Sequence, residues 1–410
     1  MMLSADVSAL DAADPLAHFR ERFQLREGLI YLDGNSLGAL PKATGARLAE
    51  VVAGEWGEGL ITSWLGAEWS TTPRRIGDKI GRLIGANPGE IVATDSTSVN
   101  IFKALTAALS LRRERPVILS EATNFPTDVY MMQGIEAFSG GRVKAVTVAP
   151  DAIAEALNDD VAVLLLTQVH YKSGRVRDMA AITRRAHDVG ALVVWDLSHS
   201  AGAIPVDLNG ANADFAIGCG YKFLNGGPGA PAYLFAAARH HAAAPVLSGW
   251  FGHARPFAFE EDYDPAAGIE RFQCGTPPVL GLSALEVGVD LMLEADMAEL
   301  RRKSLALGDL FIEHMQPLCD TYGFELVTMQ GHAERGSQVA YAHPQGYQIV
   351  QALKEYDVIA DFRAPDILRF GLTPLYLRYQ DMVETVDRLE KLCASRAWDK
   401  PQYHERAAVT

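Results

Sequence analysis

Short apolar runs recur through the middle of the chain and are separated by segments with helical spacing. Six of these runs are rich in Val, Ile, Leu and Ala, and they cover residues 117–120, 143–148, 161–167, 191–196, 215–218 and 232–235. Continuous apolar runs of this length are typical of strands that are buried on both faces. A helical pattern at 178–189 is one of those that lie between them. The alternation predicts an α/β fold with a mostly parallel, seven-stranded-type sheet that carries helices on both faces.

The pattern changes after residue 280. Apolar positions three and four residues apart predict a long helix over 281–317. Beyond it, strand-like runs mix with helical patterns; the runs lie at 323–328, 338–342, 358–363 and 368–372, and the helices at 347–356 and 379–394. We therefore expect a large domain over 46–280, then a linking helix and a small α+β domain over 281–410. Residues 1–45 are rich in turn residues and are expected to pack on the other domains.

The overall charge narrows the range of partners. The chain has 410 residues and a net charge of −14, a length that suits two or three domains. The acidic balance argues against nucleic acid or an anionic membrane as the main partner, because both require a basic face. No apolar stretch approaches the length of a membrane span, and the first residues lack the pattern of a signal peptide. We expect a cytoplasmic protein.

The four cysteines indicate no covalent or metal framework. They stand at positions 219, 274, 319 and 393, too few for a secreted disulfide scaffold in a chain of this length. None of them is in C-x-x-C spacing, so the sequence predicts neither a zinc site nor a redox pair, and no metal is expected.

Two charged residues follow neighbouring predicted strands. Asp196 ends the run at 191–196, and Lys222 stands 26 residues later in the glycine-rich sequence GCGYKFLNGGPG (218–229). Ligands of open α/β sheets bind beyond the carboxyl ends of the strands. Taken alone, Asp196 also suits a helix N-cap and Lys222 a flexible surface loop. Together they fit a cofactor that needs a carboxylate at one end and an amine at the other.

Pyridoxal 5'-phosphate (PLP) needs such a pair. Its aldehyde condenses with a lysine amine, and its pyridine nitrogen withdraws electrons only while it is protonated, which a buried carboxylate favours. Its phosphate requires converging N–H groups, and the hydroxyl-rich segment TDSTSVN (94–100) precedes a helical pattern at 101–109. Simple helix capping is the other interpretation of that segment. Phe125 follows a predicted strand and suits either stacking on a flat ring or a place in the core.

Five segments in this order resemble the kynureninase family: YLDGNSLG (31–38), FPTD (125–128), DLSH (196–199), GYKFLN (220–225) and GWFGH (249–253). The resemblance spans nearly the whole chain. The Asp–Lys spacing alone is common to aminotransferase-like PLP enzymes, and the opening and GWFGH segments narrow it to this family. The resemblance implies a hydrolase of tryptophan catabolism that cleaves the Cβ–Cγ bond of L-kynurenine to anthranilate and L-alanine. It also implies a homodimer with the active site at the subunit interface.

The resemblance assigns roles to individual residues. Lys222 is expected to carry PLP as a Schiff base and Asp196 to pair with the pyridine nitrogen. The remaining cofactor-binding residues that it implies are Ser96, Thr97, Phe125, Asp128, Thr167, His199, Tyr221, Trp250 and Thr276, the positions 250 and 276 often acting from the partner subunit. Tyr221 is adjacent to Lys222 and is expected to transfer a proton, while Lys222 is the expected base for the substrate α-proton.

Three residues are expected to contact the substrate. Arg369, in LRFG, matches the arginine that binds the α-carboxylate in this family, a role that suits a bidentate guanidinium. A surface charge at a strand end is the other interpretation of Arg369. Asn35 and Trp64 match substrate-binding positions, and Trp64 together with Thr276 indicates a preference for kynurenine over 3-hydroxykynurenine, because Trp64 is a poor partner for a ring hydroxyl.

Two other functions are compatible with the same fold. A cysteine desulfurase needs a reactive thiol on a mobile loop, and only Cys274 is placed on a predicted loop, without a neighbouring charge that would activate it. An aminotransferase would share the Asp196 and Lys222 pair. A catalytically inactive binding protein on this fold is disfavoured, because Asp196, Lys222 and Arg369 are all present.

Overall fold

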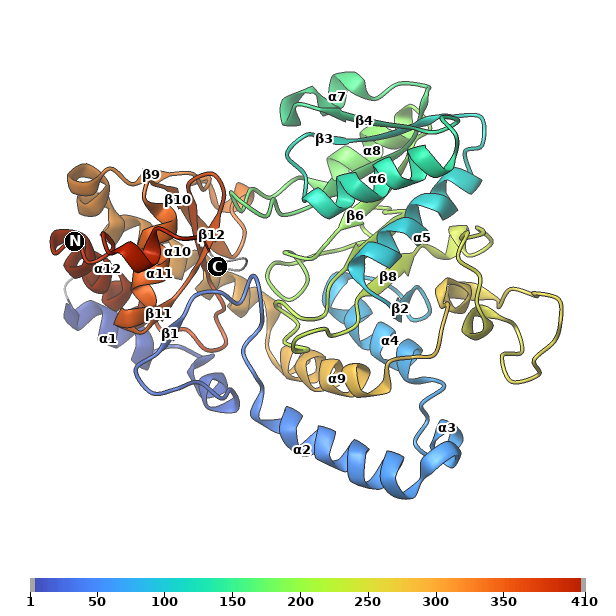
Figure 1. Cartoon of the computed structure of the whole chain (residues 1–410), viewed down its shortest axis with the longest axis horizontal. Coiled ribbons are helices and arrows are strands. Elements are labelled where there is room, and N and C mark those ends of the chain that lie inside the picture. The colour runs from blue at the N-terminus through green and yellow to red at the C-terminus, as the bar shows by residue number, and fades with distance from the viewer. Residues whose placement is uncertain (1–3, 407–410) are drawn as a thin grey trace. The chain divides into compact units, whose positions relative to one another are not determined.

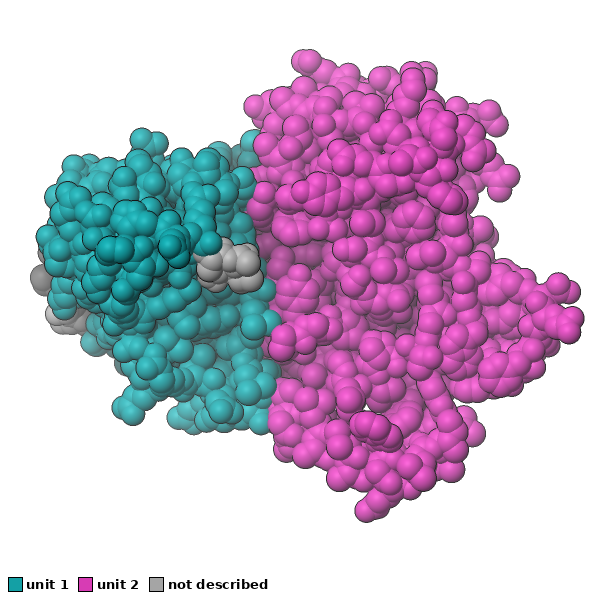
Figure 2. Space-filling model, in the orientation of Figure 1, with its two compact units in different colours: residues 1–42, 172–176, 294–410 teal, residues 43–171, 177–293 magenta. Residues whose placement is uncertain are grey.

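The computed structural model describes residues 4–406 and divides them into two compact units (Figure 2). The larger unit consists of residues 43–171 and 177–293. The smaller unit contains the described residues up to 42, the short segment 172–176, and the chain from 294 onward. Each unit has its own sheet and its own helices (Figure 1).

The larger unit is built on a seven-stranded sheet. In spatial order the strands are β2 (Ile91–Ala93), β8 (Tyr233–Ala236), β7 (Phe215–Gly218), β6 (Leu192–Asp196), β5 (Val161–Thr167), β3 (Val117–Glu121) and β4 (Lys144–Val148). The pairs β3–β4, β3–β5, β5–β6 and β6–β7 are parallel, and β8 is antiparallel to both of its neighbours. The predicted mostly parallel α/β sheet is confirmed.

Helices cover both faces of this sheet. Those of the larger unit are α2 (Lys42–Glu50), α3 (Ser63–Gly66), α4 (Thr72–Ile84), α5 (Thr97–Ser110), α6 (Pro126–Phe138), α7 (Ile153–Ala156), α8 (Met179–Asp188) and α9 (Val279–Glu294). Val194 packs in one core with α5 and α6. Trp195 points to the opposite face, where its indole Nε1 donates to Thr183 of α8 over 3.1 Å. The side chains of adjacent residues of β6 are thus buried on opposite faces of the sheet, which explains why the apolar run is continuous.

The smaller unit contains a four-stranded antiparallel sheet in the order β12 (Asp361–Arg363), β13 (Ile367–Gly371), β10 (Gln338–Ala342) and β9 (Glu325–Leu326). Its helices are α1 (Ser4–Ala12), α10 (Met297–Tyr322), α11 (Gly346–Leu353) and α12 (Tyr379–Ala394). The run at 358–363 is two strands, because β11 (Val358–Ile359) pairs in parallel with β1 (Ile30–Tyr31). The loop-rich start of the chain therefore supplies a strand that its sequence did not reveal.

The prediction of one long helix over 281–317 is wrong. The chain forms α9 and then α10, and Asp296 caps the second helix by accepting hydrogen bonds from the backbone N–H groups of Ala298 and Glu299 at 2.7 and 3.1 Å. Apolar spacing continues across the break, so periodicity alone could not locate it, whereas Asp296 followed by Glu299 is a helix-start signal. Pro317 does not end α10, which continues to Tyr322.

Within residues 4–406, no helix is both long and apolar enough to cross a bilayer. The same part of the chain contains no cluster of His, Cys, Asp or Glu side chains arranged to bind a metal ion. All four cysteines are free thiols.

A buried carboxylate links several segments at the amino-terminal ends of the parallel strands of the large sheet. Asp214, 1% exposed, precedes β7. Its two oxygens accept hydrogen bonds at 2.8 Å from the imidazoles of His187 and His240 and from the guanidinium of Arg239, and at 2.9 Å from the backbone N–H of Val193. Burial favours the neutral acid, but the two histidines hold the pKa of Asp214 below its usual range.

We expect Asp214→Asn to lower the free energy of unfolding by about 2 kcal/mol at neutral pH, since hydrogen bonds to an ionised group are lost. Because the folded-state pKa is lowered, the stabilisation is present above the unfolded value of about 4 and disappears as the pH falls through the folded value. Urea titrations at several pH values measure this difference. The exposed Asp207, changed to Asn, is the control and should shift stability by less than about 0.5 kcal/mol. Equal effects of the two changes would contradict the assignment.

Candidate active site

The carboxyl end of β6 supplies the first charged group of the site. Asp196 is the last residue of the strand, lies opposite Thr167 of β5, and is 3% exposed. Its Oδ1 accepts a hydrogen bond of 2.7 Å from the backbone N–H of Ser198. Burial raises the pKa of the Asp196 carboxyl, while Ser198 and the charge of Lys222 oppose that rise. A cationic partner at this carboxylate would therefore be stabilised.

Lys222 lies in the tight loop after β7, the strand beside β6. The loop is closed by hydrogen bonds of 2.9 Å from Asn225 N–H to the Lys222 carbonyl and from Gly226 N–H to the Gly220 carbonyl. A Cβ at Gly220 would lie 2.3 Å from the carbonyl oxygen of Pro231, so only glycine fits there. The side chain of Lys222 is 8% exposed, and its Nζ lies 3.0 Å from Nε2 of His199.

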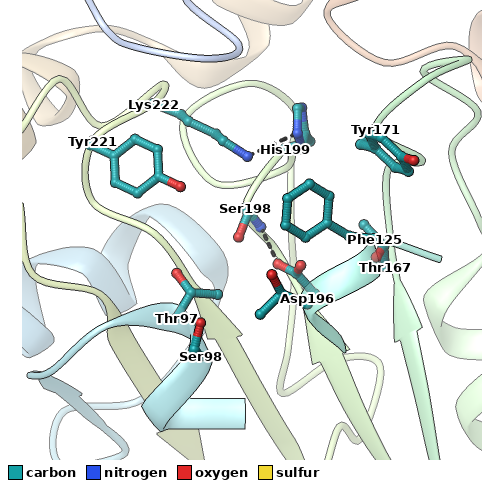
Figure 3. A pocket seen from close by; sticks show the side chains of 11 residues that line it. Thr97, Ser98, Phe125, Thr167, Tyr171, Asp196, Ser198, His199, Tyr221 and Lys222 are labelled. Atoms are coloured by element: carbon teal, nitrogen blue, oxygen red, sulfur yellow. Dashed lines mark hydrogen bonds between the residues drawn. The ribbon is translucent and has the colours of Figure 1, made fainter. Parts of the chain in front are cut away.

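These groups face one pocket of the larger unit (Figure 3). In the view of Figure 3, Lys222 and Asp196 lie on opposite sides of the pocket and the ring of Phe125 lies between them. The Nζ of Lys222 is 5.7 Å from the centre of the Phe125 ring. The lining residues are Thr97, Ser98, Phe125, Thr127, Thr167, Tyr171, Asp196, Ser198, His199, Tyr221 and Lys222. The structure thus brings together seven of the residues that the sequence singled out.

Hydroxyl groups gather where α5 begins. Thr97 and Ser98 form its first turn and line the pocket (Figure 3). Ser96 is the N-cap, and its Oγ accepts a hydrogen bond of 3.4 Å from the backbone N–H of Val99. The Oγ1 of Thr97 is buried and has no hydrogen-bond partner in the described part of the chain. A helix start with free N–H groups and an unused hydroxyl suits an anion such as a phosphate.

Asp128 lies behind the pocket in the first turn of α6 and is fully buried. Burial, followed by the charge of the nearby Asp196, raises the pKa of Asp128 well above its usual range, and Lys222 opposes this. Two neighbouring carboxyl groups with raised pKa values favour a positive charge beside them. A protonated pyridine nitrogen is such a charge, so these residues fit the ring of PLP.

Two predicted residues belong to an aromatic cluster instead of the pocket lining. The rings of Trp64 and Trp250 are 6.2 Å apart, and both contact Phe257 at 5.7 and 5.6 Å. Thr276 is exposed on the loop after the short helix at 268–272. The cluster and this loop belong to the larger unit.

Two further predicted residues belong to the smaller unit. Asn35 is fully buried and donates a hydrogen bond of 3.3 Å to Gln338. Arg369 of β13 is 1% exposed; its Nε donates to Asp361 over 2.7 Å and its Nη2 donates to the same carboxylate and, over 3.1 Å, to Ser36. The interpretation of Arg369 as a surface charge is wrong, because its guanidinium is buried and held by a carboxylate.

The pocket also contains residues that the sequence did not single out: Ser98, Thr127, Tyr171 and Ser198. Three of them lie inside motifs that had been recognised, so their neighbours were the available signal. Tyr171 lies four residues beyond β5 and contacts Phe125 edge to face, with ring centres 5.2 Å apart. A position just past the carboxyl end of a central strand could have identified it.

Comparison with known proteins identifies the family of this chain. The kynureninase of Pseudomonas fluorescens is 48% identical over 411 residues, covering 99% of this chain and 99% of that protein. The kynureninase of Burkholderia pseudomallei (strain K96243) is 48% identical over 416 residues, with 100% of both chains covered. This chain belongs to the kynureninase family. A family model described as the kynureninase C-terminal domain matches residues 300–389.

Solved structures agree on the fold of this kynureninase-family chain. The cysteine desulfurase CsdA of Escherichia coli superposes with a TM-score of 0.75 at 20% identity, covering 92% of this chain and 98% of that one. A C-DES mutant with glycine covalently linked to its PLP cofactor gives 0.77 at 17% identity, covering 90% and 98%. The resemblance drawn from the motifs is confirmed, the chain is an enzyme, and its cofactor is PLP.

The contact between Tyr171 and Phe125 leads to a prediction about cofactor affinity. We expect Tyr171→Ala to weaken PLP binding about three- to tenfold, because an aromatic pair contributes about 0.5–1.5 kcal/mol beyond its buried area and Phe125 would lose its support. Tyr171→Phe keeps the ring and should bind PLP nearly as the unmodified protein does. Fluorescence titration of the apo-protein measures both constants. Equal weakening by the two changes would mean that the hydroxyl, and not the ring, supports the site.

Proposed function

We propose that this enzyme hydrolyses the Cβ–Cγ bond of L-kynurenine to anthranilate and L-alanine, and 3-hydroxykynurenine less well, in tryptophan catabolism. The observation that carries the proposal is the pocket in which Lys222 and Asp196 face each other across Phe125 (Figure 3). The start of α5 adds an anion-binding end to the same pocket. Full-length similarity to curated kynureninases supports the choice of substrate.

The residues of the pocket fit the parts of PLP. Lys222 would hold the aldehyde carbon, Asp196 with Asp128 behind it would hold the pyridine nitrogen, and Phe125 would stack on the ring. Thr97 and the cap residue Ser96 would hold the phosphate, and the polar residues Thr167, His199 and Tyr221 would complete the site. When bound, PLP supplies an electron sink for the electron pair released as bonds to the substrate α- and β-carbons break.

Lys222 and Tyr221 are suited to move the protons of the reaction. The Nζ of Lys222, once released from the cofactor, would accept the substrate α-proton and return it, and His199 at 3.0 Å orients that amine. Hydrolysis adds the oxygen of water to the γ-carbonyl carbon and leaves a proton to be delivered to the β-carbon. Burial raises the pKa of the Tyr221 hydroxyl, so this group keeps its proton at neutral pH and can donate it there.

Arg369 supports binding of the substrate α-carboxylate. Its guanidinium is buried and already held by Asp361, and a fixed guanidinium loses little side-chain entropy when it pairs with a second carboxylate. Asn35, which belongs to the same unit as Arg369, would be a second contact to the substrate. Trp64 and Thr276 favour the unsubstituted kynurenine ring over the 3-hydroxy form, since an indole ring leaves an added hydroxyl without a partner.

The thiol chemistry of a desulfurase is disfavoured, although solved desulfurases share this fold. Such an enzyme needs a thiolate, which requires a lowered thiol pKa. Burial instead raises the pKa of each of the four thiols, those of Cys219, Cys274, Cys319 and Cys393. Cys274, the loop candidate, has its Sγ 3.4 Å from the carbonyl oxygen of Leu247, a neutral acceptor that does not stabilise a thiolate.

A homodimer, in the cytoplasm, is the form that we propose for the active enzyme. Between residues 52 and 65 the larger unit exposes a run of large apolar side chains, Val52, Trp56, Leu60, Ile61 and Leu65, with Ile61 75% and Leu65 81% exposed. Phe259, stacked on Trp250 at 6.1 Å, is also 75% exposed. Apolar side chains exposed together in this way favour a protein interface. A second copy of the chain would cover them and bring Trp250 and Thr276 to its partner's phosphate site.

The central test is the reaction itself. Purified protein loaded with PLP should release anthranilate from L-kynurenine, followed by its fluorescence, and borohydride reduction followed by peptide mapping should label Lys222. Lys222→Ala should lower turnover by at least about a thousandfold, because the base and the cofactor anchor are lost together. Tyr221→Phe should slow turnover far more than it weakens PLP binding. Labelling of another lysine, or no anthranilate from loaded protein, would refute the proposal.

Subunit mixing tests the shared site. We expect a heterodimer of one Lys222→Ala chain and one Trp250→Ala chain to recover about half of the normal activity, because one site would then contain both native residues. The control heterodimer joins an unmodified chain with one that carries both changes and should be inactive. The reverse pattern, activity only in the control, would show that Trp250 serves the site of its own subunit. Differently tagged chains allow both heterodimers to be purified.

A further inference from the structure

A fully buried lysine lies inside α5, the helix whose first turn lines the pocket. Lys103 is 0% exposed and is surrounded along the helix by apolar residues such as Ile101, Ala104 and Leu105. Its Nζ donates a hydrogen bond of 2.6 Å to Oδ2 of Asp95. It also donates to the backbone carbonyl of Phe272. Burying an ammonium group is costly unless it is fully paired, so its presence calls for a reason beyond packing.

Asp95 controls how the chain enters α5. It stands directly before the N-cap and has a φ of 50°, a left-handed conformation that is unfavourable for a residue with a side chain. Its backbone carbonyl accepts a hydrogen bond of 2.9 Å from the N–H of Ala232, and its Oδ2 accepts another of 3.0 Å from the hydroxyl of Thr94. The ion pair with Lys103 therefore helps to hold the turn that aims the first N–H groups of α5 at the pocket.

Phe272 connects the same lysine to a second segment. It ends the short helix at 268–272 and precedes the loop that carries Cys274 and Thr276. The carbonyl of Cys274 accepts a hydrogen bond of 3.2 Å from the N–H of Phe251. A Cβ at Gly249 would lie 2.2 Å from that carbonyl oxygen. The loop with Thr276 and the segment with Trp250 are thus packed backbone to backbone. Lys103 holds Phe272, the residue at which that loop begins.

We propose that Lys103 is a positioning residue for the cofactor phosphate, which it never contacts itself. Through Asp95 it fixes the start of α5, which would hold the phosphate of its own subunit. Through Phe272 it fixes the loop of Thr276 and the Trp250 segment, which would reach the phosphate of the partner subunit. The inference rests on the proposed function, since it takes the ligand of this end of the pocket to be the phosphate of PLP. Loss of Lys103 should then weaken recognition of the phosphate more than recognition of the ring.

The test compares PLP with pyridoxal, which lacks the phosphate. We expect Lys103→Met apo-protein to bind PLP at least about tenfold more weakly than the unmodified protein does, because the helix N–H groups no longer converge. Binding of pyridoxal should change less than about twofold. Inorganic phosphate should raise the melting temperature of the unmodified apo-protein and have a smaller effect on the variant. Both readouts are independent of catalytic activity.

Lys303 offers a matched control in the smaller unit. It is 1% exposed, and its Nζ is 2.6 Å from Oδ2 of Asp14 and 2.6 Å from the carbonyl oxygen of Pro374. Lys303→Met therefore removes a buried lysine with the same kinds of partner, and it should lower stability while leaving the ratio of PLP to pyridoxal affinity unchanged. The double change Lys103→Met with Asp95→Asn removes the unpaired carboxylate, so it provides a folded protein for the same titrations if the single variant is too unstable.

The outcomes separate this inference from the proposed function. A fall in the affinity ratio for the Lys103 variants alone supports it. An unchanged ratio in them, or an equal fall with Lys303→Met, overturns it and leaves Lys103 as a core residue, while anthranilate release by the unmodified enzyme keeps the proposed function intact. Failure of the unmodified protein to bind PLP at all would overturn both.

Discussion

The burial of two carboxyl groups and one amine around a single pocket is the constraint on which the site depends. Parallel strands end at one edge of a sheet, so the residues that follow β6 and β7 must lie near each other. Asp196 and Lys222 occupy these positions and are both nearly inaccessible to water. Low exposure strengthens each electrostatic interaction in the pocket, and it makes an unpaired charge there costly. A ligand that complements both ends is therefore bound favourably by this arrangement.

The pKa values of the two carboxyl groups of the site, Asp128 and Asp196, depend on each other and on Lys222. Burial, followed by the charge of Asp196, raises the pKa of Asp128 well above its usual range, and Lys222 opposes this rise. Burial also raises the pKa of Asp196, while the hydrogen bond from the Ser198 N–H and the charge of Lys222 oppose that rise. A cationic ring nitrogen would oppose the rise of both pKa values and offset the repulsion between the two neighbouring acids.

The sequence predicted those features that depend on local pattern or on motif. The buried strands β5 and β6 have continuous apolar runs. The motifs at the ends of β6 and β7 contribute side chains that meet in the pocket. β2 has only three residues, too few for a periodic signal, and β1 exists because β11 pairs with it from more than 300 residues away. The break between α9 and α10 was hidden because apolar spacing continues through it. Tyr171 was missed because a lone aromatic after a strand has no motif around it.

The burial of Lys103 could not be predicted from the sequence for a different reason. In the sequence it is one lysine in an amphipathic-looking helix, and a charged residue there is expected to face water. Only the structure shows that it is buried and that Asp95 and Phe272 meet on it. Solved cysteine desulfurases have the same fold, so the fold alone leaves the reaction undetermined. A residue remote from the reacting atoms can nevertheless set the geometry of the segments that touch the ligand, because a small displacement of those segments changes how the ligand is held.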